Sequence, residues 1–131
     1  MTRARIMLAD DHRQLLEAET ALLESHFEIV ATVMDGAMLV AEALRLRPDV
    51  IVTDITMPGL SGIDAIQRLK ESNFIPKVVV LTIHSEKEFL SACIEVGALG
   101  YVVKSRMKAH LVAAIRAALI GEQYISPFSF V

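Results

Sequence analysis

Five short aliphatic runs alternate with five segments of helical periodicity, and this alternation limits the fold more than any other feature of the chain. Apolar residues recur at helical spacing between the runs, for example at Leu111, Ile115 and Leu119. Strands that alternate with helices join through right-handed crossovers into a parallel sheet with helices on both faces. We therefore expect a doubly wound α/β domain with a five-stranded parallel sheet and five helices. The expected strands are 5–9, 27–34, 50–53, 78–81 and 100–103.

The expected strand order is 2-1-3-4-5, one of the two common orders of doubly wound sheets. In such sheets, ligands bind at the carboxyl ends of the strands, beside the point where the order reverses. The length of 131 residues fits one domain. We assign residues 1–121 to it, because Gly121 is a typical helix stop. Residues 122–131 are expected to be a C-terminal tail or the start of a linker.

Composition and charge exclude several classes of function. The net charge of −3 offers no basic surface for direct contact with nucleic acid. The apolar runs are far shorter than the roughly 20 residues that cross a bilayer, so no membrane span is expected. The single cysteine, Cys93, cannot form an intrachain disulfide, and no secretory leader is apparent. We expect a cytoplasmic protein.

Polar side chains stand where the predicted strands end. Asp10 and Asp11 follow the first strand, Asp54 the third, Thr82 the fourth and Lys104 the fifth. In the expected order these ends share one edge, which would bring together three carboxylates that are far apart in sequence. Three close anions repel one another, so such a cluster requires a cation.

Oxygen ligands of this charge suit Mg²⁺, with Mn²⁺ as a substitute of similar chemistry. A carboxylate such as Asp54 can attack phosphorus and form an acyl phosphate. Catalysis of that step is mainly positioning and neutralisation of oxygen charge. Lys104 could pair with one phosphoryl oxygen while the hydroxyl of Thr82 donates to another. The strand ends therefore predict a site for a metal and a phosphoryl group.

Over residues 4–120 the chain resembles the receiver domains of bacterial two-component response regulators, which have a flavodoxin-like fold. The stretches that carry the resemblance are LADDH (8–12), VTDITMPGLSGIDA (52–65), VVVLTIH (78–84) and GALGYVVKS (97–105). The resemblance implies that Asp54 is the phosphorylated residue. It also implies that Asp11, Asp54 and the backbone carbonyl of Thr56 bind the metal, and that Asp10 supports its water shell.

The resemblance further implies how the switch works and what it controls. Thr82 and Lys104 would hold the phosphoryl group, and Tyr101 would change its rotamer when Thr82 moves. The closing GEQYISP is most similar to receivers joined to a LuxR-type helix-turn-helix domain. The implied function is a switch phosphorylated by a sensor histidine kinase, with a phosphorylation-dependent homodimer. DNA would then be contacted only through a domain outside this chain, unless the receiver acts alone.

Each of these residues has an ordinary structural role when taken singly. Aspartate commonly caps helices or stabilises turns, and a polar residue at a strand end is commonly solvated. Only their joint position favours the phosphorylation site. His84, two residues after Thr82, could border the pocket and modulate access of water, or be an ordinary loop residue.

Three other functions would each need a sequence feature that this chain lacks or has not lost. A haloacid-dehalogenase-type phosphatase would need a DxD arrangement after the first strand, and ADDHR lacks it. A pseudo-receiver would have lost an acid or the lysine, whereas all are present. A nucleotide-binding protein would need a glycine-rich phosphate loop after the first strand, which is absent there. We therefore expect a regulatory phosphoacceptor domain that assists only its own phosphoryl transfer and dephosphorylation, with no separate enzymatic activity.

Overall fold

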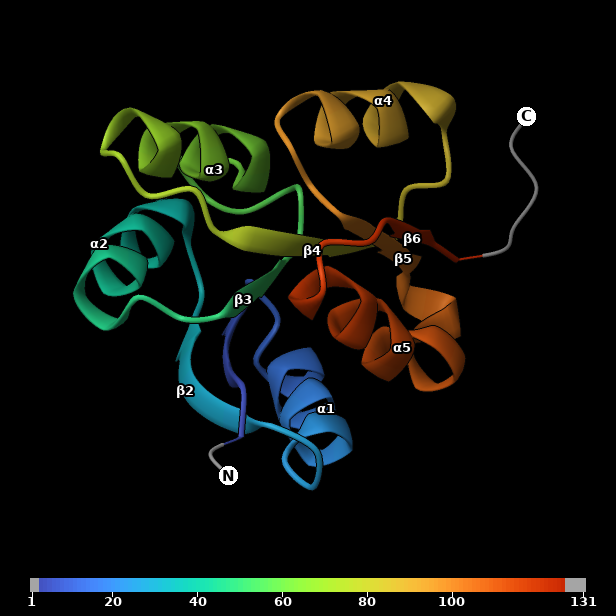
Figure 1. The fold of residues 1–131 in the computed structure, drawn as a ribbon. Coiled ribbons are helices and arrows are strands. Elements are labelled where there is room, and N and C mark those ends of the chain that lie inside the picture. The colour runs from blue at the N-terminus through green and yellow to red at the C-terminus, as the bar shows by residue number, and fades with distance from the viewer. Residues whose placement is uncertain (1–2, 127–131) are drawn as a thin grey trace.

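A computed structural model of the chain describes residues 3–126, and its strands and helices alternate along the chain (Figure 1). The elements are β1 (Arg5–Ala9), α1 (Arg13–Leu23), β2 (Glu28–Val33), α2 (Gly36–Leu46), β3 (Val50–Thr53), α3 (Gly62–Glu71), β4 (Lys77–Thr82), α4 (Lys87–Glu95), β5 (Gly100–Val103), the 3₁₀ turn η1 (Lys104–Arg106), α5 (Met107–Leu119) and β6 (Tyr124–Ile125). Residues 127–131 of the expected tail lie outside the described part.

All strands are parallel, and the sheet order is β2-β1-β3-β4-β5-β6. The predicted order 2-1-3-4-5 is confirmed, but the predicted count of five strands is wrong because β6 extends the sheet. After the turn at Gly121, which has φ 77°, the chain returns along the outer edge of β5. Tyr and Ile favour strands, and the unpaired backbone of an edge strand is a ready partner for them.

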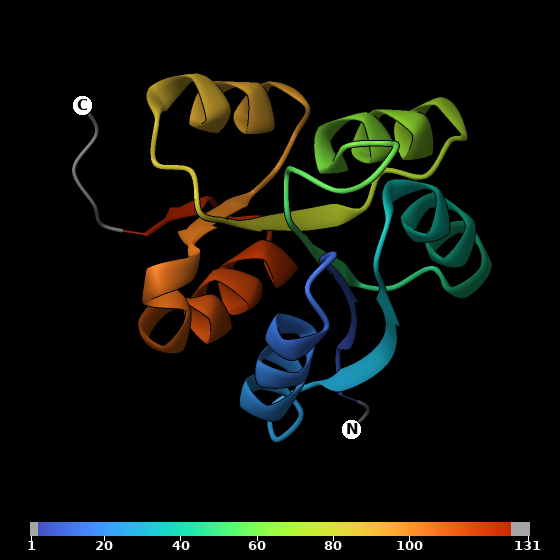
Figure 2. The ribbon, with the colours of Figure 1, turned by 180° about the vertical axis from the view of Figure 1, so that it is seen from behind.

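The sheet separates two layers of helices. Helices α2, α3 and α4 cover one face, and α1 and α5 cover the other (Figures 1 and 2). Side chains of a strand alternate between faces, so Met7 joins the cluster under α2, α3 and α4, whereas Ile6 and Leu8 join the cluster under α1 and α5. Both faces of the central strands are thus buried, which explains their continuous hydrophobicity.

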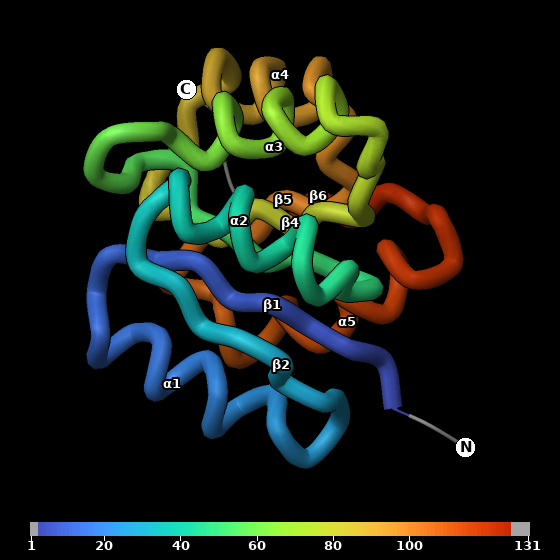
Figure 3. The backbone as a smooth tube through the Cα atoms, turned by 90° about the vertical axis from the view of Figure 1, so that its left-hand side faces the viewer, coloured from blue at the N-terminus to red at the C-terminus, as the bar shows by residue number. Residues whose placement is uncertain are grey.

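Packing on both faces holds the ends of the central strands in place. Every residue of β3 is buried, and β4 is buried from Val78 to Thr82. The side-on view in Figure 3 shows the strands running side by side between the two helical layers. In the described residues, no helix has the length and apolar character that crossing a bilayer requires.

Candidate functional site

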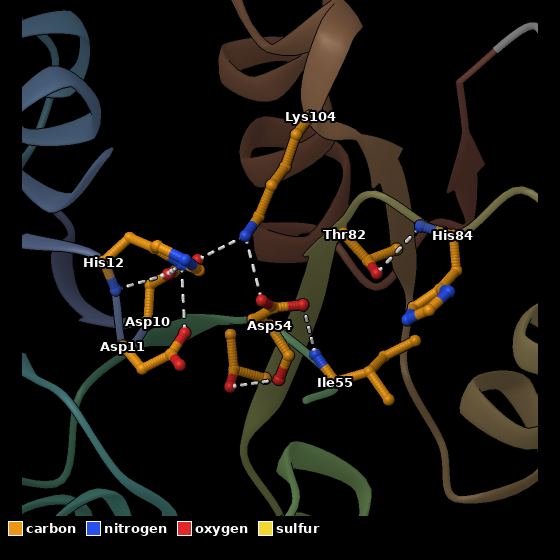
Figure 4. Close-up of polar contacts among 9 residues, drawn as sticks. Asp10, Asp11, His12, Asp54, Ile55, Thr82, His84 and Lys104 are labelled. Carbon is orange, nitrogen blue, oxygen red and sulfur yellow. Dashed lines mark hydrogen bonds and ion pairs between the residues drawn. The ribbon is translucent and has the colours of Figure 1, made fainter. Parts of the chain in front are cut away.

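The residues predicted from the strand ends meet at one edge of the sheet. Asp10 follows β1, Asp54 follows β3, Thr82 is the last residue of β4 and Lys104 follows β5. Figure 4 shows their side chains converging from these separate strands. Tyr101 differs from them, because it lies inside β5 and is buried in the core.

Lys104 binds two of the acids at once. Its Nζ lies 2.8 Å from Asp10 Oδ2 and 2.9 Å from Asp54 Oδ2 (Figure 4). The side chains of Asp10 and Asp54 are almost fully buried, and that of Lys104 is 13% exposed. Burial by itself lowers the pKa of Lys104, but its contacts with Asp10 and Asp54 outweigh that effect and raise the pKa overall. The ammonium therefore neutralises part of the acidic cluster.

The backbone holds the Asp54 carboxylate in a defined orientation. Asp54 N donates to Ala9 O at 3.1 Å, and Ile55 N donates to Asp54 Oδ1 at 2.7 Å. Across the loop that follows, Gly62 N donates to Ile55 O at 2.8 Å. A Cβ atom at Gly62 would overlap the Asp54 carbonyl oxygen, so only glycine permits this close approach.

Asp10, Asp11 and His12 form the second part of the cluster. One ligand atom from each of these residues lies within 4.8 Å of those of the other two. His12 Nδ1 is 3.1 Å from Asp10 Oδ1 and 3.1 Å from Asp11 Oδ1, although 69% of its side chain is exposed. The sequence alone did not identify His12 as part of the site, because an exposed histidine after two acids carries no distinctive signal.

The donors at this edge fit a hard divalent cation. Asp10 Oδ2 and Asp11 Oδ1 are buried oxygens that accept no well-formed hydrogen bond from the described residues; Lys104 Nζ lies 2.8 Å from the first and His12 Nδ1 lies 3.1 Å from the second. Buried carboxylate oxygens with few hydrogen-bond donors are stabilised by a bound cation that prefers oxygen ligands. The residues present therefore fit Mg²⁺.

A cavity of about 270 Å³ opens onto the acidic cluster. It is lined by Asp11, His12, Asp54, Thr56, Ile83, His84 and Lys104. Its lining combines acids, a cation and apolar atoms, so a small anionic group can reach Asp54 beside Lys104. A larger groove of about 440 Å³ lies between α1 and β2, and none of the acids at the strand ends lines it.

The loop after β4 links the cavity to Tyr101. The hydroxyl oxygen of Thr82 accepts a hydrogen bond from His84 N at 3.2 Å, and Tyr101 OH donates to His84 O at 2.8 Å. The His84 ring stacks on Phe89 with centroids 3.9 Å apart, and its Nδ1 lies 3.7 Å from Glu86 Oε2. Thr82 and Tyr101 thus both contact His84, the first at its backbone N–H and the second at its backbone carbonyl.

Glu19 is a buried acid that the sequence analysis missed. It is 1% exposed on α1, and its Oε2 has no hydrogen-bond partner in the described residues. Burial, reinforced by the charge of Asp10, raises the pKa of Glu19 to about 8. Its position was the available signal, because Leu16, Glu19 and Leu23 form the buried stripe of α1.

Known proteins resemble the chain along most of its length. The sequence profile of the response regulator receiver domain matches residues 6–116. The response regulator GacA of Pseudomonas viridiflava is 34% identical over 125 residues, which are 94% of this chain and 58% of GacA. The transcriptional regulatory protein LiaR of Bacillus subtilis is 37% identical over 120 residues, which are 90% of this chain and 57% of LiaR. The chain thus spans less than two thirds of these relatives.

Solved structures of other proteins have the same fold as this chain. A two-component response regulator of the LuxR family from Aurantimonas sp. SI85-9A1 has a TM-score of 0.91 and 35% identity, over 96% of this chain and 91% of that one. The isolated receiver domain of RcsB from Salmonella enterica serovar Typhimurium, solved with the phosphomimetic BeF₃⁻, has a TM-score of 0.86 and 26% identity, over 95% of this chain and 94% of that one.

Proposed function

Because this chain belongs to the response regulator receiver family, we propose that Asp54 accepts a phosphoryl group from a sensor histidine kinase and thereby switches a LuxR-type output. The observation that carries the proposal is the double ion pair of Lys104 with Asp10 and Asp54. The ammonium of Lys104 thus lies between the carboxylate of Asp54, which lines the cavity, and the more deeply buried carboxylate of Asp10. A phosphoryl group on Asp54 would lie against that cation.

The transfer is an in-line displacement. An Asp54 carboxylate oxygen attacks phosphorus, the bond between phosphorus and the donor's imidazole nitrogen breaks, and the nitrogen keeps the electron pair. Ile55 N, donating to Oδ1 at 2.7 Å, keeps the carboxylate from rotating. Lys104 Nζ, 2.9 Å from Oδ2, is placed to pair with the added phosphoryl oxygens.

Asp10, Asp11, Asp54 and the carbonyl of Thr56 would hold Mg²⁺, or Mn²⁺ in its place. When bound, the cation supplies neutralisation of the negative charge on the phosphoryl oxygens. The support for this assignment is the pair of buried carboxylate oxygens of Asp10 and Asp11, together with the position of Thr56 in the cavity wall.

Thr82, His84 and Tyr101 would form the switch. A phosphoryl group offers new acceptors to the Thr82 hydroxyl, which at present accepts from His84 N at 3.2 Å. A rotation of that hydroxyl alters the loop whose carbonyl accepts from Tyr101 OH. His84 lines the cavity and would also modulate the access of water to Asp54.

Mass spectrometry of the intact protein tests the phosphoacceptor. After incubation with a small phosphodonor and Mg²⁺, the wild type should gain one phosphoryl group. Asp54→Asn should gain none, because the amide is not a nucleophile of this kind. Asp64→Asn, an exposed aspartate on α3, is the matched control and should behave as the wild type does.

Two outcomes would contradict the proposal. Equal modification of wild type and Asp54→Asn would place the phosphoryl group elsewhere. Steady hydrolysis of unrelated phosphomonoesters would instead indicate a phosphatase.

A further inference from the structure

The C-terminal strand β6 is hydrogen-bonded to the strand that carries the switch residues. Tyr124 N donates to Leu99 O at 2.8 Å, and Ser126 N donates to Tyr101 O at 2.9 Å. Val103 N donates to Ser126 Oγ at 3.3 Å. Ser126 is 1% exposed, whereas Tyr124 and Ile125 are partly buried, so the end of this short segment packs most closely against β5.

Side chains reinforce the backbone contacts on both faces of the sheet. Ile125 pairs with Tyr101 across the strands and packs against the cluster that contains the Tyr101 ring. Tyr124 packs against the opposite cluster, and its hydroxyl lies 2.7 Å from His110 Nδ1 of α5. β6 is therefore tied to β5 and to α5 (Figures 1 and 3).

Two short chains of contacts lead from the strand-end site to β6, one from Asp54 and one from Thr82. One runs from Lys104, which binds Asp54, to the preceding residue Val103, whose N–H is held by Ser126. The other runs through the loop after β4, because His84 contacts Thr82 through its N–H and Tyr101 through its carbonyl. Both chains reach the hydrogen bonds that seat β6.

We propose that the docking of Tyr124–Ser126 on β5 is energetically coupled to a phosphoryl group at Asp54, so that this segment transmits the state of the site to the residues C-terminal of 126. The proposal rests on the proposed function of Asp54. An added phosphoryl group immobilises Lys104 and orders the end of β5, and the ordered edge then holds β6 more tightly. Coupling is reciprocal, so a firmly docked β6 in turn favours the phosphoryl-bound state.

Amide hydrogen exchange followed by NMR at Tyr124 and Ser126 tests the coupling in the full chain. With Mg²⁺ and beryllofluoride, exchange of these two amides should slow by at least about fivefold, the low end of typical couplings between sites. Asp54→Asn should abolish the slowing. Unchanged or faster exchange in a wild type that has bound beryllofluoride would overturn the coupling.

Reciprocity supplies a second readout. Ser126→Ala removes the acceptor for Val103 N and should weaken beryllofluoride binding, which a titration measures. It should also reduce the slowing of Tyr124 amide exchange that beryllofluoride causes. Because coupling is reciprocal, the two effects should have the same factor. The neighbouring exposed residue supplies the control Gln123→Ala, which should leave both quantities unchanged. Equal affinity in Ser126→Ala and wild type would overturn the coupling.

The two proposals fail in different ways. If the wild type neither binds beryllofluoride nor gains a phosphoryl group, the function proposed for Asp54 is wrong. If it does both and β6 does not respond, only the transmission through β6 is wrong.

Discussion

Glu19 makes the stability of the domain depend on pH in an unusual direction. Its folded pKa of about 8 exceeds the ordinary value of 4.5, so the folded chain holds a proton that the unfolded chain releases. The stabilising contribution of the protonated form is complete below pH 4.5 and is lost as the pH rises to about 8. The loss is on the order of a few kcal/mol.

Urea unfolding between pH 5 and 8 in divalent-free buffer checks this prediction. Glu19→Gln, which stays neutral, should gain stability relative to the wild type as the pH rises. Glu17→Gln, at an exposed position of the same helix, should follow the wild type. If the free energy of unfolding changed with pH in the same way in wild type and Glu19→Gln, the pKa of Glu19 in the folded protein would not be raised.

Lys104 should stabilise the folded protein most when divalent cations are absent. Lys104→Met leaves Asp10 and Asp54 buried without their shared partner, at an expected cost of about 3–5 kcal/mol. Mg²⁺ that binds only the folded state should recover part of this loss. Unfolding measured with and without Mg²⁺ should therefore show a larger metal effect in Lys104→Met than in wild type or in Lys108→Met, an exposed control. Equal metal effects would contradict a shared acidic site.

At the scale of elements, the start of α3 is held against the end of β3. Gly62→Ala would force a methyl group onto the Asp54 carbonyl, and we expect it to cost about 1–3 kcal/mol and to slow phosphorylation. At Gly59, with φ 71°, a Cβ meets no atom, so Gly59→Ala should cost only about 1 kcal/mol of backbone strain. Urea midpoints and mass-detected phosphorylation compare the two. Equal losses of stability and of phosphorylation rate in the two variants would show that neither quantity depends on the close contact between Gly62 and the Asp54 carbonyl.

The sequence predicted the elements that follow strong local patterns and missed those that do not. Asp10, Asp54 and Lys104 were found because each ends a continuous apolar run, and parallel strand ends share one edge. β6 has only two residues, and its partner is the exposed edge of β5 rather than a local turn. Glu19 was missed because a charged residue on a buried stripe violates the very pattern used to recognise the helix.

At the scale of the whole molecule, phosphorylation is expected to change self-association. α4 buries only Cys93 among its nine residues, so it is lightly held next to the loop that contains His84. Sedimentation velocity should show a larger species when beryllofluoride and Mg²⁺ are added to the wild type, and no change for Asp54→Asn. An unchanged sedimentation coefficient for the beryllofluoride-bound wild type would exclude a phosphorylation-dependent homodimer.

The single thiol of the chain, that of Cys93, lies on the buried face of α4. Cys93 is fully buried, and burial raises its pKa to about 12, so it is nearly inert to alkylating reagents while α4 stays in place. Any reaction of the native protein with iodoacetamide must then pass through a transient lifting of this helix. The rate at which the Cys93 sulfur is alkylated therefore measures how often α4 opens away from the sheet.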